Sequence, residues 1–437
     1  MTVLCIGYED KVSRLFWKIK RELSLTQPQI NFKIYSIFLS GYLFSLFRLV
    51  SCSWVSITAW IQTRVKSKFY GKLLASESNY KGVDYKSLIQ YHTLLDANIS
   101  EKKLLMQALS YIDIFSKQIQ KQRPEFALCW GDSRLAVEAF VAVCKVQKIK
   151  VYFLELGPYN TTFFDEYGVN ANASVLKQYE KQQTKPFKQK GINHRTKKGT
   201  YLRNPILRSL DYIFELVFDG LGVYPPDMLR VVQLAKFGSQ KGNQNATIQI
   251  ESEPPVFLLV MQDPNDVNMV FHSPHFNSPF EILQAVHKNL PDNAVLIVRE
   301  HPAYQNCNSD LFYDYIETND IRLDSKSSLA SQIQTADVIV VNNSTAGIEV
   351  LSSYKPLVVL GNAYYKLDAI CLGLSQKEGI KELLSEALKY EVNHNEIDCF
   401  LEFLFNTYLI SGSSDENPCV AAKSIAKILN HQPHNIQ

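Results

Sequence analysis

The chain has 437 residues, of which 46% are hydrophobic and 20% are charged. This composition excludes a disordered or fibrous protein, and the length exceeds what one hydrophobic core usually supports, so we expect two globular domains. The formal net charge of +3 is too small to indicate a partner by itself, and we expect no nucleic-acid partner.

The eight cysteines form no CxxC pair and no tight cluster with histidine. Several of them, such as Cys5, Cys129 and Cys144, lie within apolar runs and are typical of buried free thiols. The pattern indicates neither a zinc site nor a disulfide framework, which favours a reducing cytoplasm. We therefore expect a cytoplasmic protein without a zinc site.

The N-terminal part begins with an expected strand at Val3–Gly7 and a helix at Asp10–Leu23, without the layout of a signal peptide. The most apolar stretch, Ile34–Ile61, is interrupted by Arg48 and by serines, so it is too short for a membrane span and predicts buried helices. An interfacial helix on the inner face of the cytoplasmic membrane stays open as an alternative, because basic residues flank this stretch. These residues are Lys18, Lys20, Arg21 and Arg64.

Strand and helix then alternate. Ser100–Gln122 has the apolar spacing of an amphipathic helix, and Glu125–Trp130 is a strand. Arg134–Gln147 is helical and Lys150–Glu155 is the next strand, so this segment is a β–α–β crossover and predicts a parallel sheet.

The middle of the chain has weaker patterns. Residues 156–203 are polar and weakly periodic, which suggests a long functional loop. Its part Lys177–Arg203 has nine Lys and Arg against one acid. Such a run is usually a solvated loop, but it also suits an anionic lipid or polysaccharide. Tyr201–Leu221 regains a helical pattern, and the polar stretch Gly238–Glu253 is the expected interdomain linker.

After the linker the alternation returns. Strands are expected at Val256–Met261, Ala294–Arg299, Ile321–Leu323, Val338–Val341 and Leu357–Leu360. Helices are expected between them at Pro279–Asn289, Leu311–Thr318, Ser328–Thr335 and Thr345–Tyr354. We therefore predict an α/β, GT-B-like protein of two Rossmann-like domains with a cleft between them.

The stretch Ala336–Leu360 carries the first functional pattern. Its strand Val338–Val341 ends at two asparagines, and Ser344 and Thr345 open the following helix. The backbone N–H groups and hydroxyls of such a turn suit an anionic group such as a phosphate. The alternative is an ordinary N-cap, because Ser and Thr are favoured there whatever the ligand.

Carboxylates and cations follow two further strands of the second half. Asp263 and Asp266 come directly after one strand, where a carboxylate can act as nucleophile or base; a plain Asp-Pro-Asn-Asp turn is the alternative. Arg299 and His301 come at the end of the next strand, where they suit a phosphate or a carboxylate; the alternative is a surface pair with a capping role.

The first half offers candidates on the acceptor side. Glu155 ends a buried strand ahead of the long loop and could serve as a general base, or could be salt-bridged to a neighbouring helix. Asp132, which follows the strand Glu125–Trp130, and Asp165 and Asn170 in the loop are further candidates.

These segments follow one another in a fixed order along residues 125–365. Glu155-Leu156-Gly157 with Gly168-Val169-Asn170 comes first, and Gln262 to Asp266 with His272-Ser273-Pro274 comes second. His301-Pro302 is third, and Ser344 to Leu351 with Lys355-Pro356 is last. In this order they resemble the capsule polysaccharide biosynthesis family of bacterial retaining β-Kdo transferases. The chain departs from that family at Tyr354, where a glycine is usual, and at Pro158, where relatives often continue toward an arginine.

The resemblance implies a retaining transferase that moves Kdo from CMP-β-Kdo to a glycan or glycolipid acceptor. On this basis we hypothesise that Asp266 attacks the anomeric carbon to form a covalent glycosyl-enzyme, and that Glu155 then deprotonates the acceptor. His301 would stabilise the phosphate of the departing CMP. This scheme needs no metal and no cofactor, because the helix dipole, hydroxyls and cations neutralise the leaving group. The remaining donor-binding candidates are Gln262, Arg299, Ser344, Thr345, Gly347 and Glu349, the last of which would accept hydrogen bonds from the ribose.

The resemblance also suggests a domain division. We assign residues 1–250 to an acceptor-side domain, residues 251–415 to a domain that binds the CMP-sugar, and residues 416–437 to a helix that returns to the first domain. Two alternatives stay open. One is an inverting GT-B transferase that uses another nucleotide sugar, such as CMP-sialic acid. The other is a non-catalytic polysaccharide-binding protein of capsule assembly.

Overall fold

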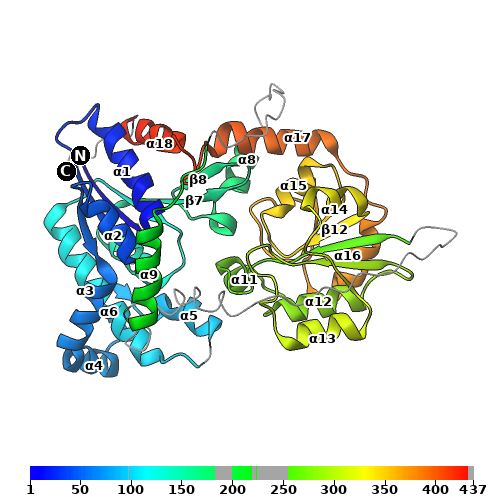
Figure 1. Ribbon diagram of the computed structural model, residues 1–437, viewed down its shortest axis with the longest axis horizontal. Coiled ribbons are helices and arrows are strands. Elements are labelled where there is room, and N and C mark those ends of the chain that lie inside the picture. Colours follow the sequence, from blue (N-terminus) through cyan, green and yellow to red (C-terminus); the bar gives the residue numbers. More distant parts are fainter. Residues whose placement is uncertain (97, 183–198, 219–222, 224–253, 432–437) are drawn as a thin grey trace. The chain divides into compact units, whose positions relative to one another are not determined.

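The computed structural model describes residues 1–96, 98–182, 199–218, 223 and 254–431 (Figure 1). These residues form two compact units. Unit 1 comprises the described residues of Met1–Ser174, Asn193–Gln233 and Thr407–Gln437, and unit 2 those of Val175–Ile192 and Leu234–Asn406. Each unit has its own sheet with helices packed on it, so the predicted α/β class with two Rossmann-like domains, as in GT-B proteins, is confirmed.

Unit 1 is built on a sheet of seven strands. They are β1 (Thr2–Gly7), β2 (Asn31–Ser36), β3 (Ser51–Trp54), β6 (Phe126–Trp130), β7 (Lys150–Gly157), β8 (Thr161–Asp165) and β15 (Ile410–Ser411). Their order in the sheet is β15-β8-β7-β6-β1-β2-β3. The strands from β7 to β3 run parallel, whereas β8 and β15 are added antiparallel at one edge. The interior strand β1, which lies between β6 and β2, is almost wholly buried, as its apolar residues require.

Helices pack on this sheet. They are α1 (Asp10–Ser24), α2 (Leu39–Leu46), α3 (Val55–Val65), α4 (Ser67–Ser76), α5 (Gln90–Leu95), α6 (Glu101–Gln122), α7 (Leu135–Val146), α9 (Pro205–Phe218) and α18 (Val420–His431). The short hairpin of β4 (Asn79–Tyr80) and β5 (Val83–Asp84) lies outside the main sheet. The predicted amphipathic helix corresponds to α6, which buries Leu105, Ile112 and Ile119 at seven-residue spacing.

The C-terminal segment lies in unit 1, where α18 packs against α1. Arg14 of α1 is only 4% exposed, and its guanidinium donates to the carbonyl groups of Ser414 (3.1 Å) and Glu416 (3.0 Å). Asn430 of α18 donates to Thr26, which follows α1. Polar contacts from residues some 400 positions apart therefore hold the C-terminal segment on the first helix.

Unit 2 contains a six-stranded parallel sheet. Its strands are β9 (Val256–Val260), β10 (Val295–Arg299), β11 (Arg322–Leu323), β12 (Val338–Val341), β13 (Leu357–Val359) and β14 (Leu372–Gly373), in the order β11-β10-β9-β12-β13-β14. Its helices are α8 (Val175–Gln182), α11 (Val267–Phe271), α12 (Pro279–Lys288), α13 (Asp310–Thr318), α14 (Leu329–Thr335), α15 (Ala346–Ser352), α16 (Ile380–Ala387) and α17 (His394–Phe403). One core joins the sheet to α12, α13 and α16 through residues such as Leu259, Leu283 and Leu384.

The N-terminal apolar region differs from the prediction. Ile34–Ile61 is not a run of helices, because it contains the end of β2, all of α2, the strand β3 and part of α3. The strand sequences NFKIYS and SCSW lack a continuous apolar run, so periodicity did not reveal them. Among the described residues, no helix combines the length and the apolar character that crossing a membrane requires. The expected linker Gly238–Glu253 lies outside the described residues.

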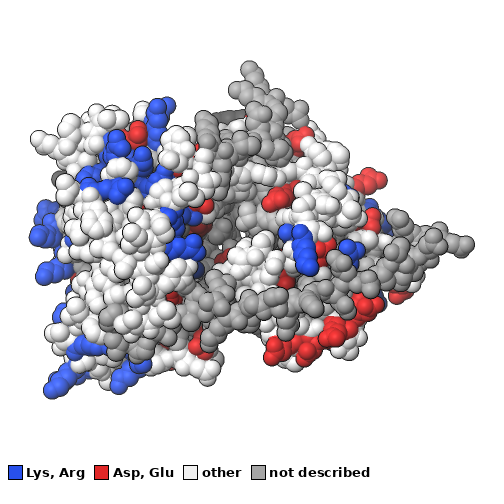
Figure 2. Space-filling view, viewed as in Figure 1, with Lys and Arg blue, Asp and Glu red and all other residues white. Residues whose placement is uncertain are grey.

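Charged side chains are distributed unevenly within each unit (Figure 2). Lys and Arg side chains gather over the part of unit 1 where α1 and α18 lie. In unit 2, Asp and Glu side chains gather over α13, whose sequence includes Asp310, Asp314 and Glu317. The small net charge of the chain therefore hides local patches of opposite sign.

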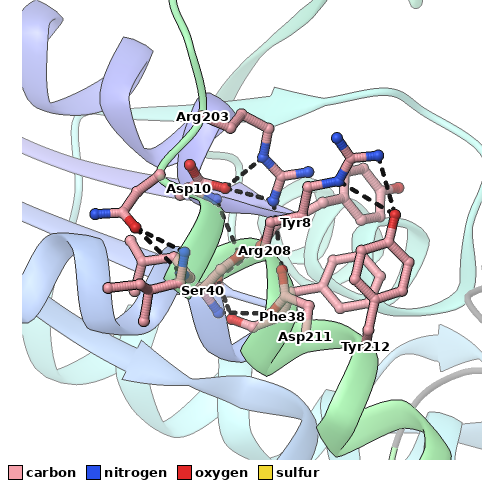
Figure 3. A network of polar contacts seen from close by, with 12 residues as sticks. Tyr8, Asp10, Phe38, Ser40, Arg203, Arg208, Asp211 and Tyr212 are labelled. Carbon is pink, nitrogen blue, oxygen red and sulfur yellow. Dashed lines mark hydrogen bonds and ion pairs between the residues drawn. The ribbon is translucent and has the colours of Figure 1, made fainter.

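A buried polar network anchors the segment before α9 to the carboxyl ends of β1 and β2 (Figure 3). Arg203 forms an ion pair with Asp10, which is fully buried at the start of α1, and its Nε lies 2.7 Å from Asp10 Oδ1. Asp211 of α9 accepts a 2.8 Å hydrogen bond from the backbone N–H of Ser40 in the first turn of α2. Burial raises the pKa of Asp211 to about 6, although the bonds from Ser40 and the charge of Arg203 oppose the rise.

This raised pKa predicts a pH-dependent stability. The ionised form of Asp211 is disfavoured in the folded state, so its contribution to the free energy of unfolding is present at acidic pH and is lost as the pH rises through about 6. Asp211→Asn should therefore be more stable than wild type above about pH 7, by at most about 3 kcal/mol, and the difference should vanish below about pH 4, where the carboxyl is protonated in the unfolded chain as well. Urea unfolding across this pH range measures it.

The control is Asp415→Asn, which removes a partly exposed ion pair with Lys11 and should change stability little at any pH. A variant Asp211→Asn that is less stable than wild type at alkaline pH would show that the ionised carboxylate is needed by the fold.

Candidate active site

Three strand ends of unit 2 meet at one edge of the sheet. Val260 of β9 pairs with Arg299 of β10 on one side and with Val341 of β12 on the other. The residues that follow these three positions therefore emerge side by side at the carboxyl edge. In open parallel sheets this is the edge where ligands bind. The predicted donor-side residues lie here.

Asp266 opens the short helix α11 after β9. Its side chain caps that helix, because Oδ1 accepts a 3.0 Å hydrogen bond from the backbone N–H of Asn268. Asp263, 9% exposed, accepts from the N–H of Asn265 at 2.9 Å. Both carboxylates thus also have the turn-forming roles that the sequence offered as their alternative.

His301 lies beside these carboxylates at the end of β10. Its Nδ1 accepts a 3.2 Å hydrogen bond from the N–H of Ala303, so in the neutral ring the proton is on Nε2. Burial lowers the pKa of His301, while the charges of Asp263 and Asp266 raise it and Arg299 lowers it further. The imidazole is therefore neutral at pH 7 and presents an N–H donor within electrostatic range of both carboxylates.

Arg299 is more deeply placed than a surface ligand-binding arginine. It is 8% exposed, and its Nη1 donates to the carbonyl of Ser327 and, at 2.8 Å, to the side chain of Gln332. Its charge also opposes the burial that raises the pKa of Glu349 on α15. Arg299 therefore stabilises the fold around β10 and at the same time places positive charge near His301 and Glu349.

The turn between β12 and α15 contains Ser344, Thr345 and Gly347. Ser344 Oγ accepts from the N–H of Ala346 at 3.3 Å, and Thr345 is exposed. Position 347 requires glycine, because a Cβ there would lie 2.5 Å from the buried ring of Tyr365. The Tyr365 hydroxyl donates to the carbonyl of Ser344, so this side chain holds the turn between β12 and α15 in place.

This contact makes Gly347→Ala a sharp test. Because Tyr365 is fully buried and cannot move freely, the added methyl should cost about 1–3 kcal/mol of unfolding free energy and displace the turn. The matched control is Gly379→Ala, since a Cβ there meets no atom within 4 Å and its φ of −81° suits any residue. Urea unfolding of the two variants compares them, and equal stability would exclude the proposed constraint.

One asparagine at this edge had no predicted role. Asn343 is 5% exposed, and its Nδ2 donates to the carbonyl groups of Asn268 and His272, each at 2.8 Å. It thereby ties both ends of α11, and with them Asp266, to the end of β12. Asparagines that follow a strand are typical of turns. The sequence therefore showed the two asparagines after β12, but it could not show that one of them bonds to both ends of α11.

Unsatisfied polar atoms also lie at this edge. Gln262 Oε1 accepts weakly from the N–H of Asn343, at 3.4 Å. Within the described part of the chain, Gln262 Nε2 and Asn343 Oδ1 are buried without a hydrogen-bond partner. Such atoms are rare in folded proteins and are usually satisfied by an ordered water or a ligand.

In unit 1, the carboxyl ends of β1, β6 and β7 bring Glu155 near two further residues. A Cβ on Gly131 would lie 3.7 Å from the Tyr8 hydroxyl and 3.9 Å from Glu155 Oε2. Gly131 itself has φ +74°, which favours glycine. Glu155 is half-buried, and its Oε1 accepts from the N–H of Leu156 at 2.9 Å. Glu155 therefore lies at the carboxyl edge of the unit 1 sheet, where the sequence predicts the base that would deprotonate an acceptor.

The other acceptor-side candidates hold the fold together. Asp132 Oδ2 accepts from the N–H of Val169 (2.9 Å) and from Asn172 Nδ2 (3.0 Å). Asp165 is 3% exposed and accepts hydrogen bonds from Tyr167, Ser174 and Tyr408. Asn170 adopts a left-handed backbone with φ +51°. The functional role of these three residues stays a prediction, and the burial of Asp165 leaves an acceptor no direct access to it.

Among the described residues, no group of three or more His, Cys, Asp and Glu side chains could hold a metal ion. The described cysteines are all free thiols, and several of them are buried.

Comparison with known proteins identifies the family. A model of the capsule polysaccharide biosynthesis protein family matches residues 125–414. The chain belongs to the capsule polysaccharide biosynthesis family. The resemblance carried by the sequence motifs is thereby confirmed, and the match spans both Glu155 in unit 1 and the edge of the unit 2 sheet.

One curated relative is Protein FixF of Sinorhizobium fredii, which is 25% identical over 179 residues. This match covers 40% of the present chain and 43% of FixF, so the chain matches less than half the length of this relative.

Solved structures resemble the chain at low identity. KpsC of Thermosulfurimonas dismutans, described as a beta Kdo 2,7 transferase, is 12% identical with a TM-score of 0.44, covering 98% of this chain and 99% of that one. The UDP-GlcNAc 2-epimerase of Methanocaldococcus jannaschii is 13% identical with a TM-score of 0.36, covering 99% and 100%.

Proposed function

We propose that this member of the capsule polysaccharide biosynthesis family is a retaining β-Kdo glycosyltransferase. Its donor would be CMP-β-Kdo, and its acceptor a glycan or glycolipid of bacterial surface polysaccharide synthesis. The observation that carries the proposal is the edge shared by β9, β10 and β12, where Asp266 and Asp263 act electrostatically on a neutral His301. A nucleophile and a donor to the leaving group are the two parts that a glycosyl transfer requires.

The first step uses Asp266. A carboxylate oxygen attacks the anomeric carbon of Kdo, and the bond from that carbon to the phosphate oxygen of CMP breaks. CMP leaves with the electron pair, and Kdo remains as an ester on the enzyme. Asn343 supports this step, because it holds both ends of α11 and thereby fixes the position of Asp266.

Stabilisation of the leaving phosphate is assigned to His301, Ser344 and Thr345. The Nε2–H of His301 can donate to a phosphate oxygen without a change of protonation, because its lowered pKa keeps the ring neutral. Arg299 adds positive charge near the same position, although one of its nitrogens is used within the protein. Hydrogen bonds of this kind act on charge that develops in the transition state.

The remaining donor contacts rest on family resemblance. Gln262 has a buried amide nitrogen that a ligand or an ordered water could satisfy, and Glu349 would accept hydrogen bonds from the ribose. Gly347 contributes by permitting the turn above Tyr365.

The second step uses Glu155 as the base. It would remove the proton of the acceptor hydroxyl, whose oxygen attacks the anomeric carbon and displaces the Asp266 carboxylate. Two inversions in succession return the β configuration of the donor. The proposed setting is the cytoplasmic side of the membrane.

Calorimetry with CMP tests the phosphate contacts. Ser344→Ala combined with His301→Ala should weaken CMP binding by about 100-fold or more, because two hydrogen bonds to a charged group are lost and each is worth about 1.5–3 kcal/mol. The control is Ser385→Ala, which removes only a hydroxyl that bonds within α16. Unchanged CMP affinity in the double variant would reject this assignment.

Calorimetry with other nucleotides, together with analysis of the product, separates the alternatives. Binding of UDP but not CMP would replace the donor class, whereas α-linked product from a CMP-sugar, seen by NMR, would replace retention with inversion. Binding of anionic glycan without transfer from any nucleotide sugar would favour a non-catalytic assembly protein.

A further inference from the structure

Four consecutive exposed residues project from unit 1 at the last residue of α2 and in the turn that follows it before β3. They are Leu46, Phe47, Arg48 and Leu49, and the three apolar side chains are 45%, 70% and 91% exposed respectively. Leu49 also has a left-handed backbone with φ +53°, which is unfavourable for a leucine. The unit itself covers little of these apolar side chains, which leaves them available to a partner outside it.

A cationic cluster lies directly beside this loop. Arg48 places its guanidinium 4.0 Å from the centre of the Phe44 ring and 5.0 Å from that of Trp17 on α1. Lys18 and Arg21 of α1 each lie 5.1 Å from the centre of the same indole. Phe44 packs edge-on against Trp17 at 6.2 Å. One aromatic pair therefore gathers three cations next to the exposed apolar loop.

These cations are not neutralised by ion pairs within the described part of the chain. Lys18, Arg21 and Arg48 make none there, and the acid whose charge reaches Lys18 is Glu22. Burial lowers the pKa of Lys18, and the charges of Arg21 and Arg14 lower it further, as expected where cations crowd together. Figure 2 shows that this part of unit 1 is rich in Lys and Arg.

We propose that the loop Leu46–Leu49 and the cluster of Lys18, Arg21 and Arg48 form a site that binds the surface of a bilayer containing anionic phospholipids. Phe47 and Leu49 enter the boundary between head groups and acyl chains, and Trp17 lies at head-group depth. The three cations contact lipid phosphates. Exposed apolar side chains flanked by cations and an aromatic ring are the combination that interfacial binding requires.

A protein partner would need different complementarity. A fluid bilayer can surround apolar side chains that project singly, and it can supply anionic phosphates at any spacing to the three crowded cations. The proposal is independent of the transferase reaction, because binding to lipid requires neither donor nor acceptor.

Cosedimentation with vesicles tests the proposal. The full-length protein should bind phosphatidylcholine vesicles that contain phosphatidylglycerol, and should bind pure phosphatidylcholine vesicles far more weakly. High salt should weaken the binding, because it screens the attraction between charges. The substitutions Lys18→Gln, Arg21→Gln and Arg48→Gln together should reduce partitioning on the order of 100-fold, given the contribution of each basic residue at an anionic surface.

The apolar component has a separate test. Phe47→Ser with Leu49→Ser should reduce partitioning by about tenfold or more while preserving the salt dependence, because the cations remain. Matched controls lie in unit 2, where Leu311→Ser with Leu388→Ser removes exposed apolar side chains and Lys288→Gln with Lys381→Gln and Lys389→Gln removes the same charge. All of these unit 2 control sites are exposed, and circular dichroism verifies the fold of each variant.

Three results would overturn the proposal. The first is equal binding to vesicles with and without phosphatidylglycerol. The second is loss of binding in the unit 2 controls to the same extent as in the unit 1 variants. The third is self-association in sedimentation velocity that the Phe47→Ser and Leu49→Ser variant abolishes while vesicle binding is unchanged, which would assign the loop to a contact between copies of the chain.

Discussion

Replacing Asp266 with asparagine should abolish transfer of Kdo from CMP-β-Kdo, with a loss of about 1,000-fold or more in rate. An amide has the shape of the carboxylate but cannot form the glycosyl ester. It keeps the oxygen that accepts from the backbone N–H of Asn268, so α11 should remain capped and the fold intact. Release of CMP in the presence of acceptor measures the rate.

Asp263→Asn is the matched control, because Asp263 belongs to the same turn and acts on the same histidine. It should reduce the rate much less than Asp266→Asn. Intact-protein mass spectrometry of wild type incubated with donor alone should reveal one added Kdo, and peptide mapping should place it on Asp266. Transfer that survives in Asp266→Asn, or an adduct on another residue, would remove Asp266 as the nucleophile.

The largest expected loss of stability comes from Asp113 of α6. This carboxylate is 7% exposed and accepts hydrogen bonds from Lys66, Lys81, Tyr70 and Tyr80. It therefore joins α4 and the β4–β5 hairpin to α6. Asp113→Ala should reduce the free energy of unfolding by about 3 kcal/mol, near the lower limit for breaking a buried ion pair. The lower limit applies because the two lysines are 43% and 41% exposed.

The loss of stability in Asp113→Ala should depend on pH, because it comes from the ionised form of the Asp113 carboxylate. Burial by itself would raise the pKa of Asp113, but the hydrogen bonds from Lys66, Lys81, Tyr80 and Tyr70 lower it to about 2. The stabilisation is therefore present above about pH 4, and it is lost as the pH falls toward 2. Urea unfolding of wild type and Asp113→Ala should converge at the acidic end.

Asp84→Asn in β5 provides the control, because that carboxylate is exposed and caps only its own turn. A difference between wild type and Asp113→Ala that did not depend on pH would show that packing, and not the charge, accounts for the loss.

Five of the six strands of unit 2 could be predicted to within one residue at each end, whereas the two-residue edge strand β14 was missed. Val256–Val260 and Val338–Val341 are interior strands of a parallel sheet with most or all of their residues buried, and such strands need continuous apolar runs that are visible in sequence; Val295–Arg299 has the same kind of run although Val295 is exposed. The edge where the candidate donor site lies followed from the same pattern, because parallel strands place their carboxyl ends together.

Unit 1 was harder to predict because its sheet is less regular. β2 carries the half-buried Lys33 and β3 is only four residues long, so neither has the composition of a central strand. β8 and β15 join the sheet antiparallel, and β15 comes from the far end of the chain. Pairing over such a distance leaves no local pattern.

Amino-acid order alone determined the α/β class, the apolar strands and the polar groups that end them, because burial and backbone geometry impose short-range patterns. Only the tertiary structure decided which of these polar groups already have hydrogen-bond partners within the protein. Asp165 is saturated in part by Tyr408, 243 residues away, and Asn343 ties α11 to β12 across 75 residues. Hydrogen-bond partners depend on distances in space, and residues remote in the chain meet only after the sheets have formed.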